Sequence, residues 1–284
     1  MRAIETHSVP PAATAANSAD RALLEEAARD AGRLAMRHFR NNPETWHKAG
    51  GSPVCVADME VDAFLFAELR AARPDYGWLS EERADDAERL RRERVFIVDP
   101  IDGTRGFLAG DPNWCVSIAI VAQGRPQAAA LFAPALDRLM TAAIGEGASE
   151  NGAAITVSER ASLSGCAIAG PTSWLKSGLW EGHAVRAGQY LPSLAWRFAS
   201  VADATFDAAF ARPRAHDWDL AACDLLVHEA GGRLTSLHGR PPLYNRAELR
   251  HGALAAANPR LHGELVTTLT RVEEERAAAG KAAR

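Results

Sequence analysis

Apolar residues recur at helical spacing twice near the start of the chain. Residues 20–39 place leucines and alanines three or four positions apart, and Ser18 or Asp20 supplies a polar cap at the start. Residues 58–71 repeat this spacing with valine, phenylalanine and leucine on one face. Between them, 46–56 is interrupted by glycine and proline, which predicts a loop or a short hairpin. The pattern therefore predicts two amphipathic helices.

Strand-like apolar runs dominate the stretch that follows. Residues 76–79 predict a short strand and 95–98 a buried strand, and the charged residues 83–94 between them predict a solvated connector. The next runs predict an antiparallel meander, so the first half of the chain is expected to be α+β. These runs lie at 114–122, 127–132 and 138–144, followed by the hairpin signal Asn151-Gly152.

In the second half of the chain the predicted helices and strands follow a different order. Residues 221–230 predict a helix that ends at Gly231-Gly232, in keeping with a glycine cap. Residues 252–257 predict a strand of small residues, and 259–272 a final helix. Three further segments, 166–169, 194–201 and 208–210, are candidate strands or short helices. We expect a flexible arm at 1–17, an α+β domain at 18–157, an α/β domain at 158–272 and a frayed tail at 273–284.

Composition narrows the class of protein. The 284 residues are 47% hydrophobic and 24% charged, as in an ordinary globular protein, and the net charge of −4 gives no case for nucleic-acid or membrane binding. No apolar run approaches the roughly 20 residues of a membrane span. The cysteines have no metal-binding spacing, which favours reduced, buried thiols in a cytoplasmic protein. They are Cys55, Cys115, Cys166 and Cys223.

Acidic residues directly follow the predicted buried strand. Asp99 and Asp102 come after the run 95–98, and Asp219 lies at the start of a predicted helix. Crowded carboxylates repel one another unless a cation lies between them. Hard oxygen ligands suit Mg²⁺, which also binds water and substrate phosphate oxygens. The residues alone therefore indicate metal-assisted phosphoryl chemistry.

Each of these acidic residues also has an ordinary structural interpretation. The pair Asp102-Gly103 is typical of a turn, and the pair Glu81-Glu82 is typical of a solvated surface. Asp219 alone would be interpreted as a helix N-cap. Their occurrence together, after strands or at a helix start, favours a site because open sheets bind ligands at such points.

The ordered motifs resemble those of the inositol monophosphatase superfamily, the Mg²⁺-dependent, lithium-sensitive phosphomonoesterases. Residues 48–58, KAGGSPVCVAD, resemble the family's K-x-x-x-S-P-V-T-x-x-D, and Ser80-Glu81-Glu82 resembles its G/S-E-E. Residues 99–104 match D-P-I/L-D-G-T, and 218–232 match W-D-x-A-A…E-A-G-G. The resemblance covers nearly the whole chain. It implies a layered αβαβα sandwich of the inositol monophosphatase and fructose-1,6-bisphosphatase type.

The resemblance also implies a set of metal ligands. Glu81, Asp99 and the backbone carbonyl of Ile101 would hold one Mg²⁺. Asp99, Asp102 and Asp219 would hold a second ion, and a third, weaker one would lie near Glu81. Mn²⁺ would be an acceptable substitute.

The same resemblance implies the residues that act on the substrate. The backbone amides of Gly103 and Thr104 would bind the phosphate oxygens. Asp58 and the Thr104 hydroxyl would orient and deprotonate the attacking water, with Glu81 also counted among the catalytic residues. Cys55 stands where the family usually has a threonine, which changes a supporting hydrogen bond but removes no ligand.

Two arginines set the expected substrate. Arg105 follows the motif threonine where inositol phosphatases usually carry Thr-Asn, and in this it resembles the 3'(2'),5'-bisphosphate nucleotidase and histidinol-phosphatase branches. Arg212 lies seven residues before Asp219, where inositol phosphatases typically place a glutamate that binds inositol hydroxyls. A guanidinium there would suit a second phosphate, and the less favoured interpretation is that both arginines are merely surface residues. Residues 114–119 resemble the nucleotidase pattern more closely.

The first hypothesis is therefore a Mg²⁺-dependent phosphatase of 3'-phosphoadenosine 5'-phosphate. The alternative is an inositol-1-monophosphatase or a histidinol-phosphatase. A catalytically silent sensor of phosphate ligands is a third hypothesis, disfavoured because every expected carboxylate is present. The expected partner is a small phosphorylated substrate, with no nucleic acid and no membrane span, and a homodimer is a possible assembly.

Overall fold

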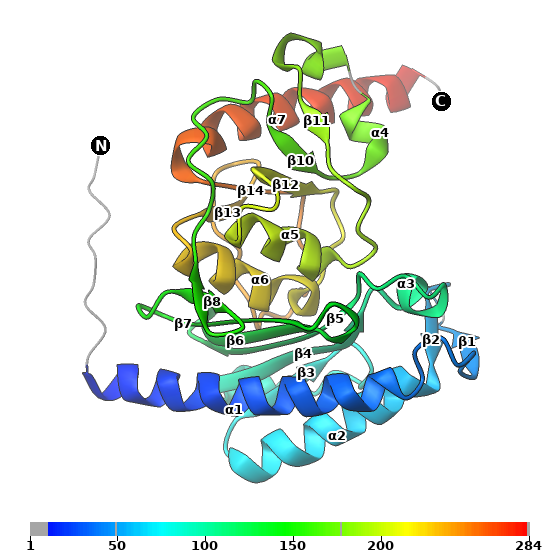
Figure 1. The fold of residues 1–284 in the computed structure, drawn as a ribbon, viewed down its shortest axis with the longest axis vertical. Helices are drawn as coiled ribbons and strands as arrows, with labels where there is room; N and C mark the ends of the chain where they lie inside the picture. The colour runs from blue at the N-terminus through cyan, green and yellow to red at the C-terminus, as the bar shows by residue number, and fades with distance from the viewer. Residues whose placement is uncertain (1–10, 49, 177, 283–284) are drawn as a thin grey trace.

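The protein folds into alternating layers of helices and sheets, as Figure 1 shows. The structure is a computed structural model that describes residues 11–48, 50–176 and 178–282. Helices α1 (Pro11–Met36) and α2 (Val56–Ala72) cover one face of a large sheet, and α5 (Leu194–Ala202) and α6 (Asp217–Glu229) cover the other. A smaller sheet follows, with α7 (Pro259–Ala282) outside it. This arrangement confirms the predicted αβαβα sandwich.

The large sheet has seven strands in the order β3-β4-β5-β6-β7-β8-β9. Only the pair β3 and β4 is parallel, and each later strand pairs antiparallel with the one before it, so the predicted meander is confirmed. The strands are β3 (Gly77–Ser80), β4 (Arg94–Asp102), β5 (Cys115–Ala122), β6 (Arg125–Ala133), β7 (Arg138–Ala143), β8 (Ala148–Glu150) and β9 (Ala153–Ile155).

The smaller sheet has five strands in the order β11-β10-β12-β14-β13 and mixes parallel and antiparallel pairs. The strands are β10 (Ala167–Ala169), β11 (Arg186–Ala187), β12 (Ala208–Ala211), β13 (Arg233–Ser236) and β14 (Leu254–Ala257). A two-stranded hairpin of β1 (Thr45–His47) and β2 (Pro53–Cys55) precedes α2. The short helices are α3 (Thr104–Leu108) and α4 (Thr172–Leu175), and the 3-10 turns are η1 (Ala87–Arg91), η2 (Pro134–Leu136) and η3 (Gly178–His183).

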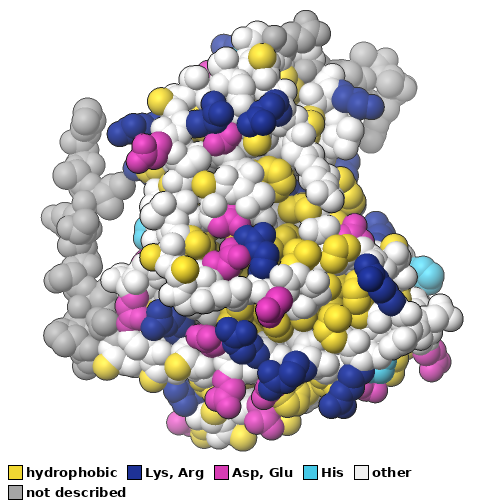
Figure 2. All heavy atoms as spheres, viewed as in Figure 1, with side chains coloured by type: hydrophobic (Ala, Val, Ile, Leu, Met, Phe, Trp, Pro, Cys, Tyr) yellow, Lys and Arg dark blue, Asp and Glu magenta, His cyan; other side chains and the backbone are white. Residues whose placement is uncertain are grey.

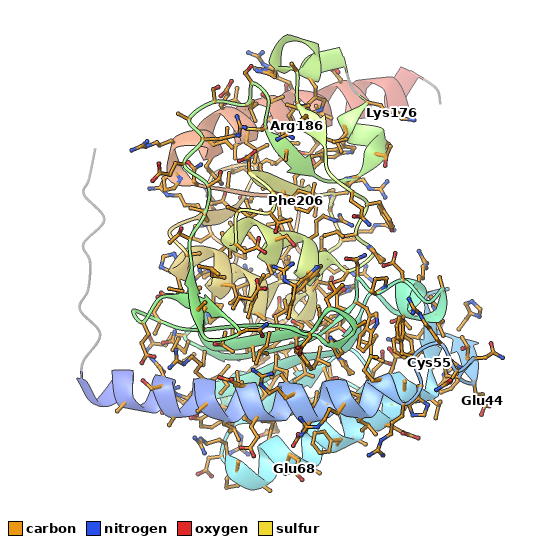
Figure 3. All side chains as sticks on the ribbon, viewed as in Figure 1. Glu44, Cys55, Glu68, Lys176, Arg186 and Phe206 are labelled. Carbon is orange, nitrogen blue, oxygen red and sulfur yellow. The ribbon has the colours of Figure 1, made fainter. Side chains whose placement is uncertain are left out.

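Strand β4 is apolar at every position from 95 to 98 because both of its faces are covered. Phe96 and Val98 belong to the core beneath α1 and α2, whereas Val95 and Ile97 belong to the core beneath α5 and α6. Side chains fill the spaces between the layers (Figure 3). Since side chains alternate along a strand, Asp99 shares the face of Val95 and Ile97. The strand therefore directs this carboxylate toward α6.

Helix α1 begins earlier than the caps Ser18 and Asp20 predicted. It starts at Pro11, within the segment expected to be a flexible arm, and residues 1–10 of that arm lie outside the described residues. Asp20 is buried inside the helix instead of capping it, and Arg94 donates to its side chain and to that of Asn17, which is also buried. Polar residues inside an ion-pair network were thus mistaken for a helix start.

Other segments also differ from the prediction. Residues 194–201, left open between strand and helix, form α5, and the final helix continues past Val272 to Ala282. Strand β13 was not predicted. The connector 83–94 is not fully solvated, because Arg89 is buried and pairs with Asp85.

The surface carries both signs of charge, interspersed on the face that Figure 2 shows. In the described part of the chain, no helix combines the length and the apolar character needed to cross a membrane. All four cysteines are buried and unpaired.

Candidate active site

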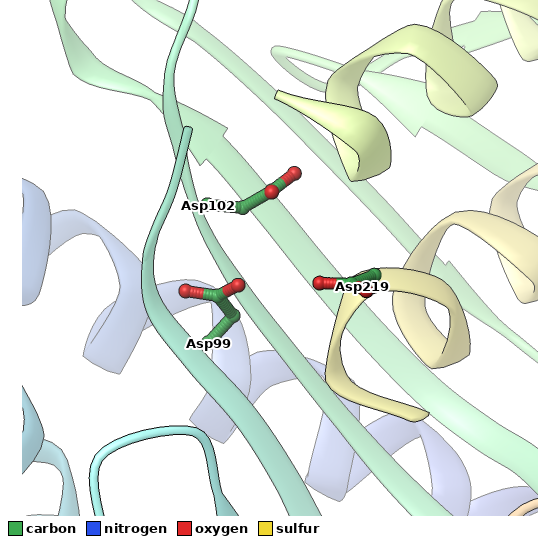
Figure 4. Close-up of side chains that lie close together, drawn as sticks. All are labelled: Asp99, Asp102 and Asp219. Carbon is green, nitrogen blue, oxygen red and sulfur yellow. The ribbon is translucent and has the colours of Figure 1, made fainter. Parts of the chain in front are cut away.

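Three aspartates from the two halves of the chain meet between the large sheet and α6. Asp99 and Asp102 lie at the end of β4, and Asp219 lies in the first turn of α6 (Figure 4). One carboxylate oxygen of each lies within 4.8 Å of those of the other two. This cluster (Asp99, Asp102 and Asp219) is called the triad below.

Local backbone features place the two carboxylates of β4. The pairing of β4 with β5 is irregular between Asp99 and Asp102, so both aspartates lie in the bulged end of the strand itself. Proline at position 100 has no N–H to give to a ladder, which suits such an irregularity. Asp99 accepts a hydrogen bond from the backbone N–H of Ile101 at 3.1 Å.

The other two members of the triad are held at helix N-termini. Asp102 Oδ2 accepts from the Ser193 hydroxyl and, at 2.6 Å, from the backbone N–H of Ala195, so it reaches across to the start of α5. Asp219 Oδ2 accepts from the backbone N–H of His216 at 2.7 Å, at the start of α6. Helix N-termini favour negative charge, which is one reason carboxylates are tolerated there.

The triad concentrates negative charge where little water reaches it. Burial raises the pKa of Asp99 and Asp219 well above the ordinary value, and the neighbouring carboxylates raise both further. Burial also raises the pKa of Asp102 to about 6, although hydrogen bonds from Ser193 and Ala195 oppose this shift. Two buried carboxylates and a partly buried one, with close oxygens and, among the described residues, no lysine or arginine paired with them, fit a divalent cation, which favours the charged forms.

A hydroxyl and a further carboxylate lie beside the triad. Thr104 Oγ1 lies 3.2 Å from Asp58 Oδ1 and 3.1 Å from the carbonyl oxygen of Ile101. Asp58 is nearly fully buried, and burial raises its pKa, although hydrogen bonds from Cys55 and Thr104 lower it. The structure thus brings the predicted pair of Asp58 and Thr104 together.

Cys55 takes the N-cap position of α2, which Figure 3 marks at the junction with β2. Its backbone N–H and its thiol both contact Asp58 Oδ2, each at 2.8 Å. Burial, together with the nearby Asp58 charge, raises the pKa of the thiol to about 12. The cysteine therefore remains a neutral donor that fixes Asp58.

Glu81 lies at the edge of the site and is held by a lysine. Lys48 Nζ donates to Glu81 Oε1 at 2.8 Å and to Glu82 Oε1 at 2.7 Å. The charge of Glu81 raises the pKa of Asp99, so the two carboxylates interact. Among the described residues Glu81 is not within the triad's 4.8 Å limit, and its carboxylate is engaged by Lys48.

The turn that follows Asp102 packs closely against the C-terminal half of the chain. Gly103 has a φ of +96°, and a Cβ there would lie 3.0 Å from the Ser193 nitrogen. A Cβ on Gly106 would lie 2.5 Å from a side-chain carbon of Pro192. Only glycine allows this approach, so the turn at 103–106 and the loop before α5 form one surface.

The two arginines expected to bind substrate are exposed. Burial lowers the pKa of Arg197, which lies on α5, and the nearby charge of Arg212 lowers that pKa further. Arg197 is itself buried and donates to the Leu191 carbonyl oxygen at 2.7 Å. Arg212 therefore lies near the α5 side of the site.

Sequence reasoning missed three contributors to this site. Ser193 precedes a segment whose helical character was left open, so its contact with Asp102 could not be seen. Lys48 belongs to a recognised motif but was given no role. His216 is partly buried directly before α6, and its ring stacks on Trp218 with centroids 4.7 Å apart.

The chain is similar to known phosphatases over most of its length. The model of the inositol monophosphatase family matches residues 17–274. A histidinol-phosphatase of Mycobacterium tuberculosis is 37% identical over 234 residues, covering 77% of this chain and 85% of the relative. An inositol-1-monophosphatase of Mesorhizobium japonicum is 34% identical, covering 83% and 90%.

Solved structures show the same likeness. The Thermotoga maritima IMPase superposes with a TM-score of 0.79 at 30% identity, covering 91% of this chain and 99% of that one. The extragenic suppressor protein suhB from Bartonella henselae gives 0.78 at 30% identity, covering 88% and 98%.

Proposed function

The chain belongs to the inositol monophosphatase family and is a metal-dependent phosphomonoesterase, and we propose that Mg²⁺ is its metal and histidinol phosphate its substrate. The observation that carries the chemistry is the triad with the Asp58 and Thr104 pair beside it. The triad would hold one Mg²⁺, and Glu81, Asp99 and the Ile101 carbonyl would hold a second. Bound Mg²⁺ polarises the phosphate ester and lowers the pKa of a bound water.

The residues beside the triad supply the water and hold the phosphate. Thr104 and Asp58 would orient the attacking water, and Asp58, whose pKa is raised, would take its proton. The amides of Gly103 and Thr104 lie at the start of α3 and would donate to the phosphate oxygens. Because Lys48 holds Glu81, the second ligand set can form only when that ion pair loosens or shares its carboxylate.

Three observations favour histidinol phosphate over inositol phosphate. A histidinol-phosphatase is 37% identical to this chain. Arg212 stands where inositol phosphatases typically carry a hydroxyl-binding glutamate, and a guanidinium cannot accept a hydrogen bond from a hydroxyl. The stacked rings of His216 and Trp218 next to Asp219 also offer a flat surface against which an imidazole can pack.

Inositol 1-phosphate is the second candidate because relatives of 34% identity carry that name. The bisphosphate nucleotide of the first hypothesis is supported only by the resemblance of residues 114–119 to the nucleotidase pattern and by two arginines, Arg105 and Arg212. Both are exposed, and the relatives reported above carry the names of the alternative activities. We therefore place it third.

Turnover of the three esters, measured side by side in Mg²⁺, tests the proposal. We expect kcat/KM for histidinol phosphate to exceed that for inositol 1-phosphate and 3'-phosphoadenosine 5'-phosphate by about tenfold or more. Arg212→Glu should reduce the ratio of kcat/KM for histidinol phosphate to kcat/KM for inositol 1-phosphate. The exposed Arg91→Glu serves as the matched control. A wild-type preference for either of the other esters would overturn the substrate assignment.

A further inference from the structure

A cavity of about 540 Å³ lies beside the loop that joins β13 to β14. This volume is within the range of small-molecule sites. None of the triad, Asp58 or Thr104 lines the cavity. Its wall combines an apolar surface of Pro241, Pro242, Leu243 and Leu254 with three arginines, Arg240, Arg246 and Arg250.

The charge of this wall is strongly positive. All three arginines are exposed, and within the described ranges none of their guanidinium groups is paired with a carboxylate. Glu248 is the one acidic residue among those lining it, and its carboxylate accepts from the backbone N–H of Arg250 at 3.0 Å. Guanidinium groups that have no carboxylate partner and surround a cavity attract anions, and phosphate most strongly.

The rim of the cavity is fixed in place before any ligand arrives. Asp217, fully buried, accepts from the backbone N–H of Asn245 at 2.7 Å, and its other oxygen lies 2.7 Å from His251 Nε2. From the N-terminal half, Arg89 donates to Asn245 Oδ1 at 2.7 Å and to the Arg246 carbonyl oxygen at 3.0 Å. A fixed rim reduces the ordering that a ligand must impose when it binds.

The cavity also contacts the start of helix α6. Arg250 Nε lies 3.2 Å from His216 Nε2, and the His216 backbone N–H donates to Asp219. A ligand on Arg250 would therefore lie two contacts away from the triad without entering it.

We propose that this cavity binds a phosphorylated small molecule with an apolar or aromatic body, at a site separate from the one that hydrolyses the substrate. The arginines hold the phosphate, and the prolines and leucines pack against the body. The site has no carboxylate cluster for a metal, so the ligand is bound and not hydrolysed.

Calorimetric titration of the full-length protein with phenylphosphonate, in chelator, tests this site. Phenylphosphonate joins a phosphonate dianion to an aromatic ring, and without metal the charge of the triad repels it from the active site. We expect saturable binding that the double variant Arg240→Gln/Arg246→Gln weakens by about tenfold or more. The exposed Arg91→Gln, at a residue that does not line the cavity, should bind like the wild type.

Two further measurements complete the test. Inorganic phosphate should bind at least several-fold more weakly than phenylphosphonate, because it leaves the apolar wall uncovered. The double variant should keep its thermal midpoint and its kcat and KM for the hydrolysed ester. Any of four results would overturn the proposal: no saturable binding by the wild type, equal binding by the double variant, equal affinity for the two probes, or a raised KM of the double variant. The titration needs no turnover, so its outcome does not depend on the proposed substrate.

Discussion

Asp99 is the residue on which the proposed chemistry depends most, because it belongs to both proposed ligand sets. Asp99→Asn keeps the shape of the side chain but removes one charge from the triad. We expect kcat at saturating Mg²⁺ to fall by more than roughly 10³-fold, on the order of 4 kcal/mol. Steady-state kinetics with a circular dichroism control would measure this. A near-normal kcat in a folded variant would contradict the assignment.

Thr104 is proposed to orient water, so its hydroxyl should affect turnover and not metal affinity. Thr104→Ala removes the contact with Asp58 at 3.2 Å, whereas Thr104→Ser retains a hydroxyl. We expect the alanine variant to lose about 10²-fold in kcat and the serine variant to stay near the wild type. Mg²⁺ titrations of activity should give similar midpoints for all three proteins. A lost metal affinity with unchanged kcat would assign Thr104 to metal binding instead.

Much of the site was predictable from sequence because its residues lie in short motifs beside a buried strand. Asp58, Thr104 and the triad were all expected, and the structure brings them together. Ser193 was not expected, because it acts through a contact with Asp102, which is distant in the chain. Such contacts depend on how α5 packs, and no local pattern encodes that.

At the scale of elements, the start of α5 links the two halves of the molecule. Ser193 caps this helix by accepting from the Trp196 N–H at 2.9 Å, and its hydroxyl donates to Asp102. Ser193→Ala should lower the free energy of unfolding by about 1 kcal/mol through the lost cap. It should also weaken Mg²⁺ binding, because a hydrogen bond that favours the charged form of Asp102 is lost.

Urea unfolding and Mg²⁺ titration of activity together measure both effects of Ser193→Ala. Ser193→Thr restores a hydroxyl at the cap and should recover most of the stability and the affinity. A loss of stability without any change in Mg²⁺ affinity would show that the contact with Asp102 is structural only.

The elements themselves were predictable where one physical signal dominated. The buried run of β4, the meander and the glycine-terminated α6 all follow from apolar pattern and turn chemistry. The errors arose where tertiary contacts override local preference. Asn17 and Asp20 are polar yet lie inside α1, because Arg94 lies opposite them.

At the scale of the whole molecule, the triad should make the metal-free protein less stable as pH rises. Burial and mutual repulsion raise the folded-state pKa values of Asp99 and Asp219, and that of Asp102 to about 6 from an ordinary 3.8. An acid with a raised folded pKa binds more protons in the folded state. Its destabilising effect is therefore absent below the ordinary pKa, and it grows until pH exceeds the folded value.

Thermal unfolding in chelator and in Mg²⁺ measures this effect directly. In chelator, the three aspartates of the triad should lower the thermal midpoint progressively as pH rises from about 5 to about 8. The stabilisation by Mg²⁺ should increase over the same pH range. Asp99→Asn is the matched control, because it removes one of the repelling charges. In chelator at about pH 8 this variant should be more stable than the wild type, and Mg²⁺ should stabilise it less. Two results together would contradict this prediction. The wild-type midpoint in chelator would not change between about pH 5 and pH 8, and Asp99→Asn would be less stable than the wild type at both pH values. The carboxylates of the triad would then not repel one another in the folded protein. Greater stability of an inactive variant is the outcome expected of a site whose carboxylates are placed to hold a cation.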